Sequence, residues 1–143
     1  MNYPSASQKK IHVLVVDDEP DNLFTFLRVL RGRYDITLAS SGVEALARLA
    51  AAGDVPVNAV LVDFAMPGMD GAAFVAKLRE GYPHLPCLFL TAYAEVELVK
   101  LASRQHGVSA VIMKPWQRED VERRIEHAIR IGSMRRSIRA VRG

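Results

Sequence analysis

Three acids, a hydroxyl and a lysine each follow a short apolar run of the sequence, and they are Asp17, Asp18, Asp63, Thr91 and Lys114. Three carboxylates in one place repel one another and raise each other's pKa values unless a divalent cation lies between them. Mg²⁺ suits oxygen ligands and retains several waters, so it leaves room for a phosphate oxygen. Asp63 could then act as a nucleophile and form an acyl phosphate. Lys114 would pair with the phosphoryl group, and Thr91 would hydrogen-bond one of its oxygens.

Each of these residues also has an ordinary structural reading when it is taken alone. An Asp pair after a strand is a common helix N-cap, and an acid before Pro67-Gly68 is common turn chemistry. A Lys-Pro pair after a strand is compatible with a sheet edge. The conjunction favours a shared site, because all five residues follow expected strands in the order acid pair, acid, hydroxyl, lysine.

The elements that must position these residues alternate along the chain. Apolar runs predict buried parallel strands over residues 11–16, 34–39, 58–62, 86–90 and 109–113. Helical spacing predicts helices over residues 18–32, 41–52, 71–80, 94–105 and from 117 onward. Ser41, with Glu44 three residues later, indicates a capping box at the second helix.

This alternation predicts an α/β fold, a doubly wound five-stranded parallel sheet in the order 2-1-3-4-5 with an extended C-terminal helix. In such sheets ligands bind beyond the carboxyl ends of the strands, at the point where the strand order reverses. The five polar residues are therefore expected to converge on one small crevice.

Length and composition are typical of one ordinary domain. The chain has 143 residues, half of them apolar, and its single cysteine, Cys87, cannot form an internal bridge. Residues 1–8 lack the apolar core of a signal peptide, and no apolar run approaches the length of a membrane span. We expect a cytoplasmic protein with a disordered segment over residues 1–9, a domain over 10–130 and a helical extension over 131–143.

Charge is mildly basic and concentrated at the C-terminus. The net charge is +3, and five arginines follow His127 without an acid. A basic tail can bind nucleic acid or anionic lipid, but cations also suit a solvated helix end. We favour the helix end, and direct nucleic-acid binding by this chain is not expected.

Four segments together resemble the response regulator receiver domain of two-component signalling, the family of the chemotaxis protein CheY. They are VLVVDDEPDN (13–22), LVDFAMPGMDG (61–71), LTAYA (90–94) and MKPW (113–116), and the resemblance covers about residues 10–130. It implies a flavodoxin-like fold and a phosphoacceptor that switches partner or output interactions, rather than a turnover enzyme. Trp116 is expected to be a packing residue.

The resemblance also implies roles for individual residues. Asp63 would accept a phosphoryl group from a sensor histidine kinase or a phosphotransfer protein. Asp18 would coordinate Mg²⁺ directly, with Asp17 close by or acting through water, and the backbone carbonyl of Ala65 would complete the protein ligands. Thr91 and Lys114 would hold the phosphoryl group, and the Lys114-Pro115 bond would be cis.

Two positions depart from the family pattern. The residue three before the lysine is often Tyr or Phe and turns inward on activation, but here it is Val111, which carries no ring. The residues two after the aspartate and two after the threonine, which control water access, are Ala65 and Tyr93. Neither orients an attacking water as a carboxylate or amide would. We expect slow self-dephosphorylation, with Tyr93 shielding the phosphoryl group.

The final helix extends beyond what a bare receiver needs. Ile131, Met134, Ile138 and Val141 follow one another at 3-4-3 spacing, a heptad fragment. This pattern is compatible with a homodimerisation helix, with a linker to an output domain, or with a helix end that frays or packs back. The family resemblance also implies a transmission or homodimer face formed by the expected helix 94–105, strand 109–113 and final helix.

Two other classes of function compete with a phosphorylated receiver. A protein-interaction or dimerisation module could keep the fold without ever being phosphorylated. A small phosphohydrolase would need an Asp-x-Asp pair, which Asp63-Phe64-Ala65 lacks.

Overall fold

The structure is a computed structural model that describes residues 10–53, 55–92 and 96–142, with side chains described as far as residue 134. The expected disordered segment 1–9 and the expected shielding residue Tyr93 lie outside the described residues.

Five parallel strands form the centre of the molecule in the order β2-β1-β3-β4-β5, as the sequence predicted. The strands are β1 (His12–Val16), β2 (Asp35–Ala39), β3 (Ala59–Asp63), β4 (Cys87–Thr91) and β5 (Ala110–Met113). Every residue of β3 and β4 is buried, which explains their unbroken apolar sequence.

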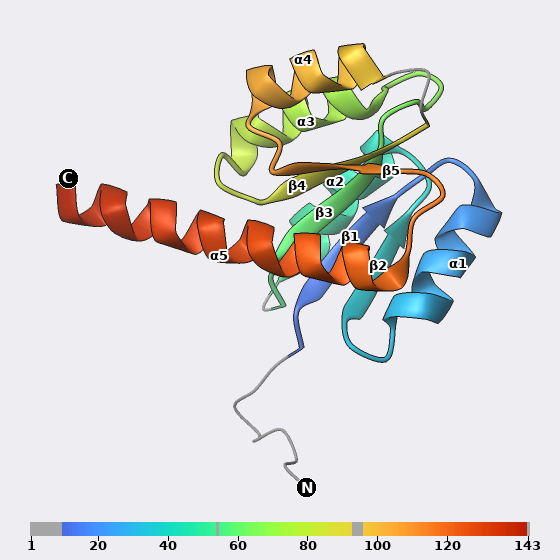
Figure 1. Ribbon diagram of the computed structural model, residues 1–143, viewed down its shortest axis with the longest axis horizontal. Helices are drawn as coiled ribbons and strands as arrows, with labels where there is room; N and C mark the ends of the chain where they lie inside the picture. Colours follow the sequence, from blue (N-terminus) through green and yellow to red (C-terminus); the bar gives the residue numbers. More distant parts are fainter. Residues whose placement is uncertain (1–9, 54, 93–95, 143) are drawn as a thin grey trace, which may run out of the picture.

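Helices cover both faces of this sheet (Figure 1). They are α1 (Pro20–Leu30), α2 (Gly42–Ala51), α3 (Gly71–Gly81), α4 (Val96–His106) and α5 (Arg118–Arg142). One core cluster joins the sheet to α2, α3 and α4, and the other joins it to α1 and α5. In β1, Val13 and Val15 face the second cluster while Leu14 and Val16 face the first, as the two-residue period of a strand requires.

The helix starts follow local capping chemistry. The Ser41 hydroxyl accepts a hydrogen bond from the Glu44 N–H at 3.1 Å, and Asp70 caps α3 through the Ala73 N–H at 2.8 Å. In the expected capping box, the Glu44 carboxylate would accept a hydrogen bond from the Ser41 N–H. It accepts one from the Ser40 N–H instead, at 3.0 Å. Helix α1 begins at Pro20 rather than residue 18, which leaves Asp17 and Asp18 in the loop after β1.

Helix α5 packs on the sheet through Val121, Ile125 and Ala128 and then extends past the domain body (Figure 1). At its start Trp116 stacks on Phe26 of α1, with ring centroids 4.3 Å apart, so the expectation that this residue serves packing is confirmed. No helix in the described part of the chain is long and apolar enough to cross a membrane.

Candidate functional site

The sheet register brings the ends of four strands to one edge. Val16 lies beside Val62, Asp63 beside Leu90, and Thr91 beside Met113. Asp17 and Asp18 therefore follow β1 at the edge where β3 and β4 end, and Lys114 follows β5 there. All five residues therefore lie at the edge of the sheet where the sequence predicted them.

The three acids form one cluster. Each of Asp17, Asp18 and Asp63 offers a carboxylate oxygen, and these oxygens all lie within 4.8 Å of one another. Asp17 is fully buried and Asp63 is only 6% exposed. The carboxylate of Asp17 is fixed by the Glu19 N–H at 3.0 Å and the Asn22 side-chain amide at 3.1 Å. A fixed acid cluster of this kind is suited to a hard cation.

Lys114 provides positive charge at the cluster. Its Nζ lies 3.3 Å from Asp63 Oδ2 and 4.0 Å from Asp17 Oδ2. Its backbone N–H donates to the Thr91 carbonyl at 2.9 Å, which ties the loop after β5 to the end of β4. The Lys114-Pro115 peptide bond is cis, as the family resemblance implied.

The environment of Asp63 disfavours its charged form. Burial is the largest influence and raises the pKa of this carboxyl above its ordinary value, and the nearby charge of Asp17 raises it further. Lys114 and the Ala65 N–H lower the pKa but do not reverse the net rise. An added positive charge beside Asp63 would therefore favour the ionised, nucleophilic carboxylate.

The donor set fits a divalent cation. Three carboxylates meet one lysine ammonium in this crevice, so positive charge is in deficit when all three acids are ionised. Oxygen ligands that are largely carboxylate, with space left for water, are those that Mg²⁺ prefers. Asp17, Asp18 and Asp63 are the residues that would hold such an ion.

The loop after Asp63 is held by close backbone contacts. The Phe64 N–H donates to the Leu90 carbonyl at 2.9 Å, and the Gly71 N–H donates to the Phe64 carbonyl at 2.8 Å. A Cβ at Gly71 would lie 2.8 Å from both the Asp63 carbonyl oxygen and the Phe64 Cα. Gly68 adopts φ +74°, which favours glycine. These contacts fix the position of the Asp63 backbone.

Thr91 and two of the three positions expected to control switching and lifetime, Ala65 and Val111, lie within the described residues. Thr91 is fully buried, and its hydroxyl donates to the Ala92 carbonyl at 3.0 Å. Ala65 is exposed, and its N–H donates to Asp63 Oδ1 at 3.3 Å. Val111 is half-buried on β5 and packs against the core cluster of α2, α3 and α4.

Two residues that position the site were not singled out from the sequence. Asn22 orients Asp17, and the signal for it was a carboxamide in the first turn of the helix that follows the acid pair. Gly71 allows helix α3 to approach the Asp63 loop. It carried no separate signal, because a glycine at a helix start is ordinary.

The chain belongs to the response regulator receiver domain family, which it matches over residues 13–126. Among curated relatives, it is 33% identical to the regulatory protein AtoC of Escherichia coli K12 over 130 residues, covering 89% of this chain and 27% of AtoC. It is also 33% identical to the hydrogenase transcriptional regulatory protein HoxA of Cupriavidus necator over 110 residues, covering 77% of this chain and 22% of HoxA. The chain thus spans about a quarter of the length of these relatives.

A solved structure shares the same fold. The CheY-like response regulator receiver domain protein from Methanospirillum hungatei JF-1 is 25% identical, with a TM-score of 0.77. The match covers 89% of this chain and 99% of that one. The strand order and the family match together confirm the CheY-like fold predicted from the sequence.

Proposed function

We propose that Asp63 accepts a phosphoryl group from a phosphohistidine on a sensor histidine kinase or a phosphotransfer protein. The observation that carries the proposal is the Asp63 carboxylate, which lies 3.3 Å from the Lys114 ammonium and beside two further acids. In the transfer, the phosphorus–nitrogen bond breaks and its electron pair stays on the imidazole. An oxygen of Asp63 forms the new phosphorus–oxygen bond, which gives an acyl phosphate.

The surrounding residues act by position and charge, as phosphoryl transfer requires. Lys114 pairs with the phosphoryl oxygens, and the Thr91 hydroxyl turns from the Ala92 carbonyl to donate to one of them. Asp17 and Asp18, with Asp63 and the backbone carbonyl of Ala65, would hold Mg²⁺. When bound, this ion neutralises charge on the acids and on the incoming phosphoryl group.

The phosphorylated state then changes interactions with partners. Val111 has no ring to turn inward, so the movement of Thr91 and Lys114 passes to the rest of the molecule without the usual aromatic switch. We place the exchange in the cytoplasm. HoxA is a transcriptional regulatory protein, and by that likeness this receiver would control a transcriptional output. The receiver comprises residues 10–130, and residues 131–143 form an extension that serves as a linker or dimerisation helix.

A phosphorylation assay tests the proposal. The protein is incubated with acetyl phosphate and Mg²⁺, and its intact mass is measured. We expect one added phosphoryl group in the wild type, none in Asp63→Asn, and an unchanged adduct in the control Asp35→Asn, since Asp35 is an exposed acid of β2. The adduct should also disappear when Mg²⁺ is chelated.

The same assay separates the alternatives. A wild type that gains no mass would indicate a receiver-like interaction module that is never phosphorylated, for which the valine at position 111 is the supporting observation. An adduct that persists in Asp63→Asn would contradict the assignment of Asp63.

A further inference from the structure

Asp17 is the most fully enclosed acid of the cluster, and it is held by two neutral donors. Its side chain has no exposed surface. The Glu19 N–H donates to Asp17 Oδ1 at 3.0 Å, and the Asn22 side-chain amide donates to Oδ2 at 3.1 Å. A buried carboxylate needs such donors, because it has lost its contact with water. These two bonds therefore determine where the charge of Asp17 lies.

Both donors come from the start of α1. Glu19 is the N-cap residue of this helix, and its side chain makes no capping hydrogen bond. Asn22 lies in the first turn, where its backbone N–H donates to the Glu19 carbonyl at 3.1 Å. A side chain at this third helical position commonly reaches back to the N-cap N–H. Here that N–H already donates to Asp17, and Asn22 donates to the same carboxylate.

A positive charge lies close to the oxygen that Asn22 holds. Lys114 Nζ is 4.0 Å from Asp17 Oδ2, whereas it is 3.3 Å from Asp63 Oδ2. The lysine thus pairs more closely with Asp63 than with Asp17. A charge-assisted bond from an ammonium is stronger than a bond from a neutral amide, so a carboxylate that was free to turn would move toward Lys114. The bond from Asn22 opposes this movement.

The neutrality of the Asn22 amide is what suits it to a cation site. An amide fixes a carboxylate without cancelling its charge, whereas a lysine or an arginine would supply the positive charge itself. An ionised Asp or Glu at this position would add negative charge and could not donate. Asparagine therefore fixes the geometry of Asp17 and leaves its full charge available to a hard cation.

We propose that Asn22 is a positioning residue for the divalent cation, because it holds Asp17 in the crevice and withholds it from Lys114. The inference rests on the proposed function, in which a cation binds the acid cluster, and it extends that function by giving α1 a part in the affinity. Without the amide, Asp17 would pair with Lys114. That pair would have to be broken before the carboxylate could serve as a ligand.

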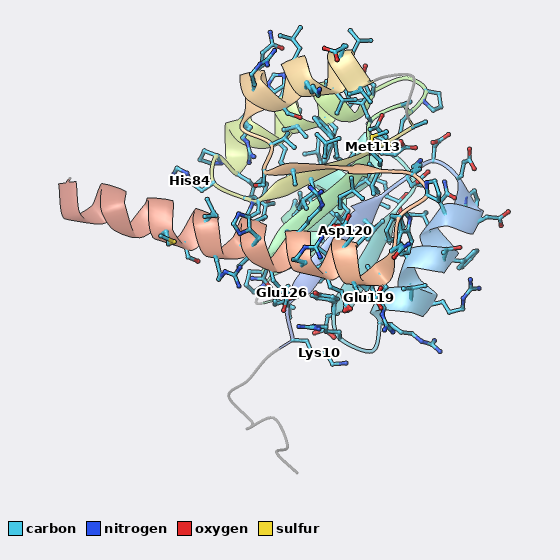
Figure 2. All side chains as sticks on the ribbon, in the orientation of Figure 1. Lys10, His84, Met113, Glu119, Asp120 and Glu126 are labelled. Atoms are coloured by element: carbon cyan, nitrogen blue, oxygen red, sulfur yellow. The ribbon has the colours of Figure 1, made fainter. Side chains whose placement is uncertain are left out.

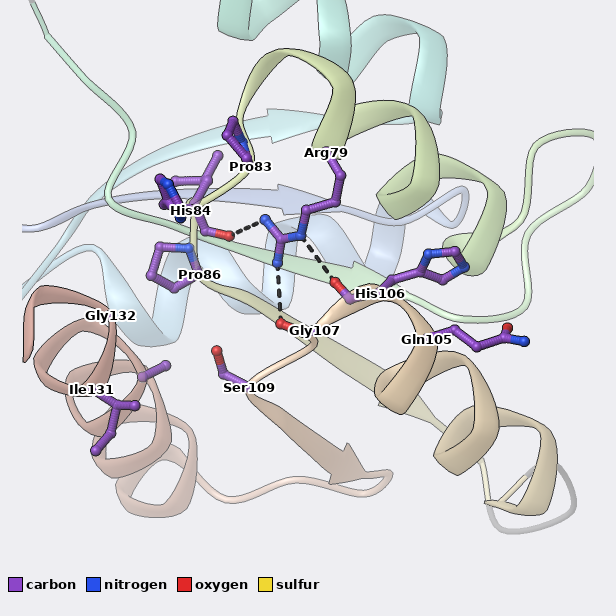
Figure 3. A pocket seen from close by; sticks show the side chains of 12 residues that line it. Arg79, Pro83, His84, Pro86, Gln105, His106, Gly107, Ser109, Ile131 and Gly132 are labelled. Carbon is purple, nitrogen blue, oxygen red and sulfur yellow. Dashed lines mark hydrogen bonds between the residues drawn. The ribbon is translucent and has the colours of Figure 1, made fainter. Parts of the chain in front are cut away.

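The opposite end of the molecule is held by a separate set of bonds, which offers a comparison. The Arg79 guanidinium donates to the carbonyls of Leu85 at 2.6 Å, His106 at 3.0 Å and Gly107 at 3.2 Å (Figure 3). These carbonyls precede β4 and β5, whereas the acid cluster follows β1 and β3. Figure 2 labels His84 near the Arg79 end and Met113 at the crevice edge. Arg79 therefore supports the fold at a distance from the acids.

Titration with Mg²⁺, followed by the amide chemical shifts of the protein, tests the proposal. We expect Asn22→Ala to bind Mg²⁺ roughly tenfold more weakly than the wild type. Thr25→Ala is the matched control and should bind as the wild type does. It removes another side-chain hydrogen bond of α1, from the Thr25 hydroxyl to the Asp21 carbonyl at 2.8 Å. Arg79→Lys should melt at a lower temperature, since lysine has no fork of donors, but should keep the wild-type affinity.

A double-mutant cycle with Lys114→Met identifies the competitor for Asp17. In that background Asn22→Ala should weaken Mg²⁺ binding much less, because no ammonium remains to take the carboxylate. The proposal is wrong if this loss is equal in both backgrounds, or if Thr25→Ala or Arg79→Lys weakens binding as much as Asn22→Ala does. A wild type that binds no Mg²⁺ would overturn the proposed function as well. Wild-type binding that persists unchanged in Asn22→Ala would overturn this inference alone.

Discussion

At the scale of single residues, Asp63 shows a conflict between function and stability. Burial at the end of β3 and the neighbouring Asp17 both disfavour its charge, although phosphoryl transfer needs an ionised carboxylate. Lys114 offsets part of this cost. A bound cation would supply the positive charge that is still missing. Without a cation, the acid cluster lowers the free energy of unfolding.

Stability should therefore depend on pH through Asp63. Because the folded-state pKa of Asp63 lies above its unfolded value, the folded state holds the proton more tightly. The resulting stabilisation is complete below the unfolded pKa and is lost as pH rises through the folded pKa. Without Mg²⁺ at pH 7, Asp63→Asn should be more stable than the wild type, by about 1 kcal/mol.

Urea unfolding at several pH values measures this effect. The advantage of Asp63→Asn should shrink as pH falls toward 3.8, the ordinary value for the carboxyl. The exposed control Asp35→Asn should show no comparable advantage at pH 7. An Asp63→Asn protein that is less stable than the wild type at pH 7 would contradict the account of its burial.

At the scale of elements, the strands were easier to predict than the loops that follow them. The buried strands β3 and β4 can be recognised from their apolar composition alone. The parallel register of the sheet then brings Asp63, Thr91 and Lys114 to one edge. The hydrogen bond from Asn22 to Asp17 and the reach of Glu44 to Ser40 depend on side-chain direction, which periodicity does not specify. The fold and the acid cluster were predictable, but the contacts that orient the acids were not.

Gly71 offers a direct test of how α3 supports the site. A Cβ at this position would lie 2.8 Å from the backbone of both Asp63 and Phe64, and backbone cannot move aside as a flexible side chain can. We expect Gly71→Ala to lose about 1–3 kcal/mol of unfolding free energy and to slow phosphorylation of Asp63.

Gly32→Ala is the matched control, because nothing lies within 4 Å of a Cβ built there. Its stability should stay close to that of the wild type in the same denaturation experiment. Equal losses in the two variants would show that close approach at Gly71 is not the cause.

At the scale of the whole molecule, the sheet and its helices form a receiver body from which α5 extends (Figure 1). The chain matches only about a quarter of the length of these relatives, so receivers of this kind occur within larger regulators. Met134 on the extension is 59% exposed, and the sequence spaces further apolar residues after it at heptad intervals. We propose that this extension pairs with a second copy.

Light scattering checks the pairing. The full chain should have twice the mass of one copy, and truncation after Arg130 should halve it. Met134→Ser should weaken the dimer, whereas Phe24→Ser, which removes an equally exposed apolar side chain from α1, should not. Identical masses for the full and truncated chains would rule out pairing through the extension.

The length of α5 also determines how far its C-terminal end would move if the helix tilted. Its base is clamped by Val121, Ile125 and Ala128 against the sheet and begins beside Trp116, two residues after Lys114. Beyond residue 130 the helix rises roughly 18 Å, so a tilt of about 10° at the clamp would displace the tip by roughly 3 Å. The helix is therefore long enough to turn a small tilt of its packed segment into a larger displacement at its end.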